Sequence, residues 1–414
     1  MKINQLFKRF KNVFVDSMWS IAGLMLMNLV AQFVVYPILA NQLGAEANGD
    51  ILTLIAYINI ISVAVGSGVN YARMRNSNTE MTKNGDYNVC LIFASIVCIP
   101  VSFIAQHITA IHLDIVNSIL YLLLMIAMLW RYYADVDFRL NLNYKGLFKY
   151  YFCISLGYGI GIVLYLLVGY WPLSLLIGEI AGLVYVLAFG RILNKDCFSF
   201  SKNRKSSIHV ILTLIATNLL LNLIFNADRL LLNVLVNGTA VTLYYIASLL
   251  GKTVSLVTTP LNSVIIGYTA RYKGKLTMKM LMVASALIMA IIILATFVCT
   301  IGSHILIRFL YPEDYDAAVP YFVLANLSQI IYCCTNSMTT FLLCFTKSKY
   351  QLYINIIYMI AFIFIGVPVT WLWGLDGFVK GLVLVNIIRA SVTFSVGLRQ
   401  VNLNKKMEIK ENDK

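Results

Sequence analysis

Charged side chains are scarce in this sequence of 414 residues: they make up 12% of the chain, whereas 60% of the residues are hydrophobic. An ordinary soluble domain is nearer one quarter charged. A water-soluble globule of this size could not bury so much apolar surface, and the mean hydropathy is +0.80. The composition therefore excludes a large soluble domain and predicts that lipid surrounds most of the chain.

Patterns that would indicate metal, disulfide or nucleotide chemistry are missing as well. The eight cysteines form no C-x-x-C pair, and the four histidines have no metal-ligand spacing. We interpret the cysteines as small buried hydrophobic residues. The nucleotide motif G-x-x-x-x-G-K-[ST] does not occur. We expect no metal, no cofactor and no ATP hydrolysis by the chain itself.

Long apolar segments fill the rest of the sequence, and each is close to the roughly 20 residues that one bilayer crossing needs. Residues 1–16 precede them with an amphipathic pattern that predicts a helix lying on the membrane surface. It continues into a first span without the features of a cleaved signal. The predicted fold is an all-α polytopic membrane protein with twelve transmembrane helices, at about 17–40, 50–70, 88–105, 113–130, 147–168, 172–190, 208–236, 240–268, 279–300, 318–345, 350–371 and 375–397.

The positive charges are distributed unequally between the two sides of this arrangement. Of the 32 lysines and arginines, 27 fall in segments on the same side as residue 1, and only Arg308 falls in an outer loop. The other four lie inside spans. Cytoplasmic loops carry the excess of Lys and Arg, so both termini are expected in the cytoplasm. The asymmetry also explains the net charge of +14 without a nucleic-acid partner.

The two halves of the chain show weak similarity to each other. With a shift of 194 residues, Met27-Asn28-Leu29 aligns with Leu221-Asn222-Leu223, and Leu43-Gly44 aligns with Asn237-Gly238. Copies with an even number of spans are related by a pseudo-two-fold axis along the membrane normal. The expected organisation is an interfacial helix at 1–16, an N-terminal six-helix lobe at 17–190, a cytoplasmic linker at 191–207, a C-terminal six-helix lobe at 208–397 and a cytoplasmic tail at 398–414.

Two of the predicted spans carry continuous polar faces. At about 100° per residue, the five polar residues of span 7 lie within an arc of roughly 80°. Interhelical hydrogen bonds explain single polar residues in lipid. Whole faces that each include a cation favour a water-filled path instead. These faces consist of Asn218, Asn222, Asn226, Arg229 and Asn233 in span 7, and of Tyr245, Ser248, Lys252, Ser255, Thr259 and Asn262 in span 8; span 10 repeats the pattern more weakly with Gln329, Asn336 and Thr340.

The charged residues inside the spans are mainly positive. Arg229 and Lys252 are predicted to lie deep, whereas Lys380 and Arg389 are close enough to the span ends to snorkel. Asp228 and Glu179 are the acids expected within spans, and each is either part of an ion pair between helices or a proton or cation site. The excess of cations predicts a cavity that attracts anions, most naturally phosphates.

Several short motifs carry a resemblance to a known family. They are Asp228-Arg229-Leu230-Leu231-Leu232, Asn237-Gly238, Tyr244-Tyr245-Ile246-Ala247, Leu261-Asn262-Ser263-Val264, Ala270-Arg271, Leu43-Gly44 with Gly49, Leu310-Tyr311 with Tyr315 and Ala317, and Trp373-Gly374-Leu375-Asp376-Gly377. With these motifs, spans 7 and 8 and the loops around them resemble those of polysaccharide-unit flippases of the multidrug/oligosaccharidyl-lipid/polysaccharide exporter superfamily. The chain departs from that family at Gly267, where Pro is frequent, and at Leu243, where Gly is frequent.

The resemblance implies a flippase for a polyprenyl-pyrophosphate-linked oligosaccharide in O-antigen or capsule assembly. It implies alternating access between two six-helix lobes in a bacterial inner membrane, with a polysaccharide polymerase and chain-length proteins as further partners. Asp228 or Glu179 is expected to couple transport to an ion gradient. Tyr158, Tyr244, Tyr245 and Tyr332 are candidates for stacking on sugars. The candidate substrate-binding residues are Arg229, Lys252, Asn222, Asn226, Asn218, Ser248 and Tyr245.

Three other functions compete with this interpretation. A cation-coupled multidrug antiporter of the same superfamily would favour acids in the cavity rather than Arg229 and Lys252. A major-facilitator sugar carrier would carry a Gly-rich Asp-Arg pattern in the loop at 71–87, where Tyr71-Ala72-Arg73 stands. A membrane-embedded polymerase or glycosyltransferase would need a large outer loop. The longest one expected here spans 301–317, so we expect no enzyme and no catalytic residues.

Overall fold

The computed structural model describes residues 18–76, 83–109, 111–193, 197–201, 204–269, 274–347 and 349–412, and the described secondary structure is entirely helical. The predicted surface helix at 1–16 lies outside these residues. The first described helix, Met18–Leu43, includes a π-helical segment. The elements are η1 (Ala31–Val35), α2 (Tyr36–Leu43), α3 (Ala45–Ile58), η2 (Asn59–Val63), α4 (Ala64–Arg75), α5 (Asn84–Ile108), α6 (Ile115–Ala134), α7 (Val136–Leu140), α8 (Tyr144–Val168), α9 (Leu173–Phe189), α10 (Arg204–Leu235), α11 (Gly238–Thr269), α12 (Met278–Leu310), α13 (Tyr315–Ala318), η3 (Val319–Tyr321), α14 (Phe322–Leu343), α15 (Lys349–Ala361), η4 (Phe362–Gly366) and α16 (Val367–Asn412).

The twelve predicted spans all have helical counterparts. Ten helices of the described residues are long and apolar enough to cross a membrane, and Leu173–Phe189 is a shorter apolar helix. The last of the ten, Lys349–Lys405, contains Gly374 at φ 58° and ψ −138°, which interrupts the helix between predicted spans 11 and 12. A positive φ is easy only for glycine, so the chain breaks direction there. The predicted all-helical polytopic fold is confirmed.

Proline positions explain several local departures from regular helix. Pro37 and Pro368 lie inside predicted spans, and each stands two residues after the end of a π-helical segment, η1 or η4. Proline cannot donate to the carbonyl four residues earlier, and a local π turn accommodates that loss. Pro100 also lies inside a helix, α5, which the sequence analysis did not anticipate as a kink site.

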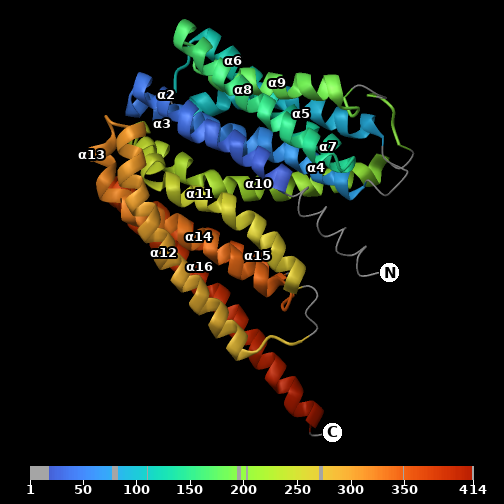
Figure 1. Ribbon diagram of the computed structural model, residues 1–414, viewed down its shortest axis with the longest axis vertical. Coiled ribbons are helices and arrows are strands. Elements are labelled where there is room, and N and C mark those ends of the chain that lie inside the picture. Colours follow the sequence, from blue (N-terminus) through green and yellow to red (C-terminus); the bar gives the residue numbers. More distant parts are fainter. Residues whose placement is uncertain are drawn as a thin grey trace. The chain divides into compact units, whose positions relative to one another are not determined.

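Two compact units make up the chain, Met1–Leu230 (unit 1) and Leu231–Lys414 (unit 2). The division falls within α10, later than the linker expected at 191–207. In unit 1, α8 packs along α9, and α6 packs on both α9 and α4 (Figure 1). In unit 2, α14 packs on α11, α12 and α16. The proposed lobe boundaries and pseudo-two-fold axis remain expectations.

Close backbone approach joins α8 to α9. A Cβ added to Gly157 would lie 2.5 Å from the Cα of Gly178, and one added to Gly161 would lie 2.5 Å from the backbone O of Leu173. Small residues let membrane helices approach this closely, where packing rather than the hydrophobic effect drives association. The approach places Tyr158 of α8 beside Glu179 of α9.

Part of the expected linker is bound to unit 1. The backbone N of Gly85 donates to Ser199 O at 2.9 Å, and Asn88 Nδ2 donates to Cys197 O at 3.0 Å. The Asp86 carboxylate accepts from the backbone N of Ser201 at 3.3 Å. Since Asp86 and Asn88 are buried, this segment is held against the start of α5.

The outer loop expected at 301–317 is much shorter in the structure. Helix α12 continues to Leu310 and α13 begins at Tyr315, so Arg308 lies in the last turn of a helix rather than in a loop. The helix continues past Ser303 and His304 because both side chains have partners, Asn326 at 3.0 Å and the Tyr315 hydroxyl at 2.9 Å. Partial burial and the neighbouring Glu313 raise the pKa of the Asp314 carboxyl in the remaining turn.

Candidate functional site

The asparagine face predicted on span 7 is present on α10. Asn218, Asn222 and Asn226 each donate Nδ2 to the backbone O four residues earlier, at 2.8, 2.9 and 2.9 Å. The Oδ1 of Asn226 also accepts from Asn59 Nδ2 at 3.4 Å. The donors of this row are therefore used within the helix, which leaves amide oxygens as the groups it presents to neighbours.

The two charged residues that follow this row lie at the end of unit 1. Asp228 is buried, and its Oδ1 accepts from the backbone N of Arg229 at 2.9 Å. Arg229 is half-buried. Two of the predicted site residues are therefore adjacent in unit 1, and Asp228 is the more buried of them.

Glu179 forms a buried ion pair that the sequence analysis left as one of two alternatives. Arg131 Nε lies 2.5 Å from Oε2 of Glu179, and Arg131 Nη2 donates to Oε1 at 3.2 Å. The two side chains are 2% and 0% exposed. Tyr158 donates its hydroxyl to the same Oε1 at 2.5 Å. This bidentate geometry is the strongest arrangement for an arginine and a carboxylate.

Arg131 was assigned to a cytoplasmic loop and is instead buried in the membrane-length helix Ile115–Leu140. Its guanidinium stands 3.8 Å from the ring centre of Tyr132, and its backbone O accepts from the Tyr150 hydroxyl at 3.0 Å. The flanking aromatics and Glu179 together compensate the charge. The span predicted at 113–130 ends where the apolar run ends, at Trp130, so Arg131 fell outside it.

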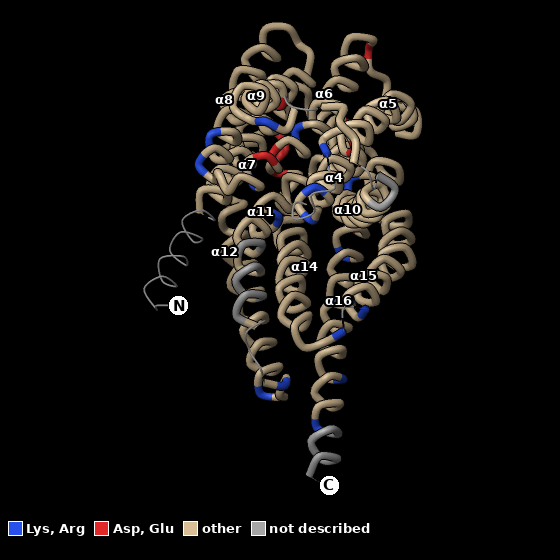
Figure 2. Tube along the Cα trace, turned by 90° about the vertical axis from the view of Figure 1, so that its right-hand side faces the viewer, with Lys and Arg blue, Asp and Glu red and all other residues tan. Residues whose placement is uncertain are grey.

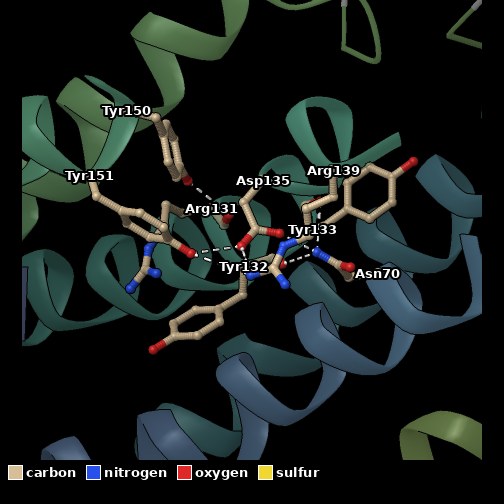
Figure 3. A network of polar contacts seen from close by, with 8 residues as sticks. All are labelled: Asn70, Arg131, Tyr132, Tyr133, Asp135, Arg139, Tyr150 and Tyr151. Atoms are coloured by element: carbon tan, nitrogen blue, oxygen red, sulfur yellow. Dashed lines mark hydrogen bonds and ion pairs between the residues drawn. The ribbon is translucent and has the colours of Figure 1, made fainter. Parts of the chain in front are cut away.

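A second network lies where α6 meets α7, as Figure 3 shows. The Asp135 carboxylate accepts from Arg139 Nη2 at 2.8 Å and from the Tyr151 hydroxyl at 2.9 Å. Asn70 donates to the same carboxylate and to Tyr132 O, the latter at 2.9 Å. In Figure 2 a group of acidic residues lies beside α7. Unit 1 thus pairs its buried Asp135 with the nearby Arg139.

Unit 2 holds the predicted residues of span 8. Lys252 is half-buried, and its Nζ stands 5.3 Å from the ring centre of Tyr244, whose hydroxyl accepts from Gln329 Nε2 at 2.6 Å. Tyr245 and Ser248 are 3% and 0% exposed, so protein atoms surround them. Ser248 donates to the backbone O of Tyr245 at 3.4 Å. The cation, rather than Tyr245 or Ser248, is the more accessible part of this face; the Thr259 side chain lies outside the described residues.

Arg389 of α16 is also buried, at 3% exposed. Its Nη2 donates to Oδ1 of Asn336 at 2.6 Å and to Oδ1 of Asn355 at 3.5 Å, and its Nη1 donates to Tyr332 O at 3.5 Å. The guanidinium stands 4.4 and 5.2 Å from the ring centres of Tyr332 and Tyr358. Arg389 was expected near a span end, within reach of the membrane surface, and it is buried instead. The spacing of residues in the sequence does not reveal its neutral partners on α14 and α15.

No family model matches this sequence, and no curated protein matches it. Solved structures do match, over nearly the whole chain. An inward-facing multidrug resistance MATE family transporter of the MOP superfamily shares 12% identity at a TM-score of 0.68, covering 92% of this chain and 95% of that one. The fold is that of the MATE transporters.

Two further matches agree on this fold. The MATE transporter VcmN of Vibrio cholerae in its bent form has 16% identity and a TM-score of 0.59, covering 95% of this chain and 98% of its own. A MOP superfamily transporter from Pyrococcus furiosus has 14% identity and a TM-score of 0.60, covering 95% of this chain and 96% of its own. The latter is described as having a binding pocket of reversed polarity that suggests a different function.

Proposed function

We propose that this chain is a flippase that moves a polyprenyl-pyrophosphate-linked oligosaccharide across a bacterial cytoplasmic membrane by alternating access, with both termini in the cytoplasm. The MATE-like fold supports a transporter. The substrate belongs to surface polysaccharide assembly, such as O-antigen or capsule, and the lipid tail stays in the bilayer while the head group crosses. A polysaccharide polymerase and chain-length proteins would act on the translocated unit.

One observation about charge carries the substrate assignment. The spans of unit 2 that hold Lys252 and Arg389 contain a single carboxylate, Asp376, beside the break at Gly374. The acidic residues placed at membrane depth in unit 1 include Glu179 and Asp135, which are ion-paired with Arg131 and Arg139. A surface that unit 2 contributes to a transport path is therefore positive or neutral, which suits a pyrophosphate.

In this proposal Arg229 and Lys252 contact the pyrophosphate. Asn218, Asn222 and Asn226 offer amide oxygens to sugar hydroxyls, and Tyr245 and Ser248 support the helix face that carries Lys252. Asp228 or Glu179 couples movement to an ion gradient. Of these two, Glu179 also holds α6, α8 and α9 together, so its replacement affects folding as well as coupling.

The test is translocation of a fluorescent polyprenyl-pyrophosphate oligosaccharide in proteoliposomes that contain the whole chain. We expect Arg229→Ala and Lys252→Ala each to abolish movement of the head group while reconstituting as well as the wild type. Lys380→Ala, which removes an exposed cation of α16, is the matched control and should retain transport. Normal transport in both test variants would refute the assignment.

The second candidate is a cation-coupled multidrug antiporter. Its support is the MATE-like fold, which the matched multidrug transporter shares. Proton-driven efflux of a cationic dye from the same proteoliposomes, lost in Asp228→Asn, would establish this candidate. Dye efflux without oligosaccharide movement would replace the flippase proposal.

A further inference from the structure

Arg389 and Arg131 present the same chemical edge to different partners. In Arg131, Nε and Nη2 donate hydrogen bonds to the two carboxylate oxygens of Glu179. In Arg389, Nη2 reaches only the neutral amide oxygens of Asn336 and Asn355, and among the described residues Nε has no acceptor within hydrogen-bond distance. Arg131 thus shows within one chain how this edge binds an oxyanion.

The helices that pack together in unit 2 offer Arg389 few carboxylates. Helices α11, α12, α14 and α15 contain no Asp or Glu. On α16 itself, Asp376 lies 13 residues before Arg389 and Glu408 lies 19 residues after it, which is about 20 Å or more at the rise of an α-helix. An arginine cannot lose its proton in a protein, so the charge persists.

Buried positive charge at membrane depth is expensive without a counter-charge. The faces of Tyr332 and Tyr358 offset part of this energy through cation–π contact. Two amide oxygens accept hydrogen bonds from the guanidinium but carry no negative charge, whereas a carboxylate would also supply a counter-charge. The surroundings therefore hold the guanidinium in place without neutralising it.

The residues on one side of Arg389 are less buried than the arginine itself. Asn336, Asn355 and Tyr332 are all half-buried, whereas Arg389 and Tyr358 are 3% and 7% exposed. A group that displaced the Asn336 oxygen would reach both Nη2 and Nε. It would need two oxygens at the spacing found in a carboxylate or phosphate to form the bidentate hydrogen bonds seen at Arg131.

We propose that Arg389, with Asn336 and Asn355, forms an oxyanion site inside unit 2 that takes a phosphate group on its Nε and Nη2 edge. The site uses neither Arg229 nor Lys252, and it does not depend on the substrate proposed above. Inorganic phosphate and the phosphate monoester of a lipid head group share this chemistry.

Thermal unfolding of the full chain tests the site, and it does so without any transport measurement. In detergent at constant ionic strength, inorganic phosphate replaces chloride or acetate. We expect a saturable rise in Tm for the wild type that is lost in Arg389→Gln and kept in Lys380→Gln, which removes an exposed cation of the same helix. General salting effects act equally on the three proteins and cancel in the comparison.

A second variant covers the case in which Arg389→Gln fails to fold. Asn336→Asp places a carboxylate where Nη2 already finds its acceptor at 2.6 Å. It should raise the Tm measured in chloride and remove the response to phosphate. A phosphate response in Asn336→Asp equal to that of the wild type would overturn the proposal.

Nanodiscs distinguish the two sources of phosphate. If a lipid head group is the ligand, the Arg389-dependent rise in Tm should occur on replacing phosphatidylcholine with phosphatidic acid and not on adding free phosphate. The reverse pattern identifies the free ion. The proposal is wrong if neither raises the Tm in an Arg389-dependent way, or if acetate equals phosphate.

Discussion

The two units surround a buried arginine with different kinds of groups. Unit 1 surrounds Arg131 with a bidentate carboxylate, a tyrosine hydroxyl and an aromatic ring, so that the cluster as a whole is neutral. Unit 2 surrounds Arg389 with amide oxygens and two aromatic rings, and none of its carboxylates pairs with Arg389 among the described residues. A buried charge with an internal counter-ion serves the fold, and one without is available to a ligand.

The largest effect should come from breaking the unit 1 pair. Glu179→Gln leaves Arg131 buried without its counter-charge, and removal of one partner of a buried pair costs about 3–5 kcal/mol. Thermal unfolding in detergent should show a large loss of Tm. The double variant Arg131→Met with Glu179→Leu should recover most of it, since apolar residues of similar volume often replace such pairs at little cost. A Glu179→Gln protein as stable as the wild type would mean that the pair contributes nothing to the fold.

The second network should be less sensitive. Asp135→Asn keeps the shape but removes the charge that accepts from Arg139 and Tyr151, and we expect a loss of about 1–3 kcal/mol, typical of a buried hydrogen-bonding group left with weaker partners. Arg139 is 34% exposed, so water can solvate its guanidinium once the pair is lost. The same unfolding measurement should rank Asp135→Asn clearly below Glu179→Gln, and the reverse order would contradict this account.

The smallest effect on basal stability is expected for Arg389→Met, and it should contrast with the effect of Arg131→Met. Arg389→Met removes a charge that unit 2 does not neutralise, so Tm in chloride should stay unchanged or rise. Arg131→Met leaves Glu179 buried and unpaired, and should therefore destabilise the protein strongly. If Arg389→Met destabilises the chain as much as Arg131→Met does, then Arg389 is a structural residue like its counterpart.

The order and type of the helices followed from the sequence because apolar length is a local property. Span ends were less accurate: α12 continues to Leu310, well beyond the predicted 300. The polar groups after residue 300 find partners elsewhere in the fold, Ser303 with Asn326 and His304 with Tyr315. The Asn218, Asn222 and Asn226 row was also predicted correctly, since residues four apart lie on one face of a helix whatever surrounds it. Gly374 was expected in a turn, and its positive φ agrees.

The partners of the buried charges were less predictable. Arg131 and Glu179 are 48 residues apart and on different helices, so no periodicity links them. Glu179 was left open between an ion pair and an ion site, and the structure shows the ion pair; a coupling role remains a proposal. Arg389 gains its three partners from residues 34 to 57 positions away.

Composition and spacing alone determined that this chain is an all-helical membrane protein, because hydrophobic length and helical period depend only on residues close together in the sequence. They also determined that helices α11, α12, α14 and α15 contain no Asp or Glu, which no folding can change. Only the tertiary structure decided which charge meets which partner, because burial at membrane depth forces each ionic group to find a neighbour on another helix. That packing neutralised Arg131 with Glu179, and it placed Arg389 among neutral amides.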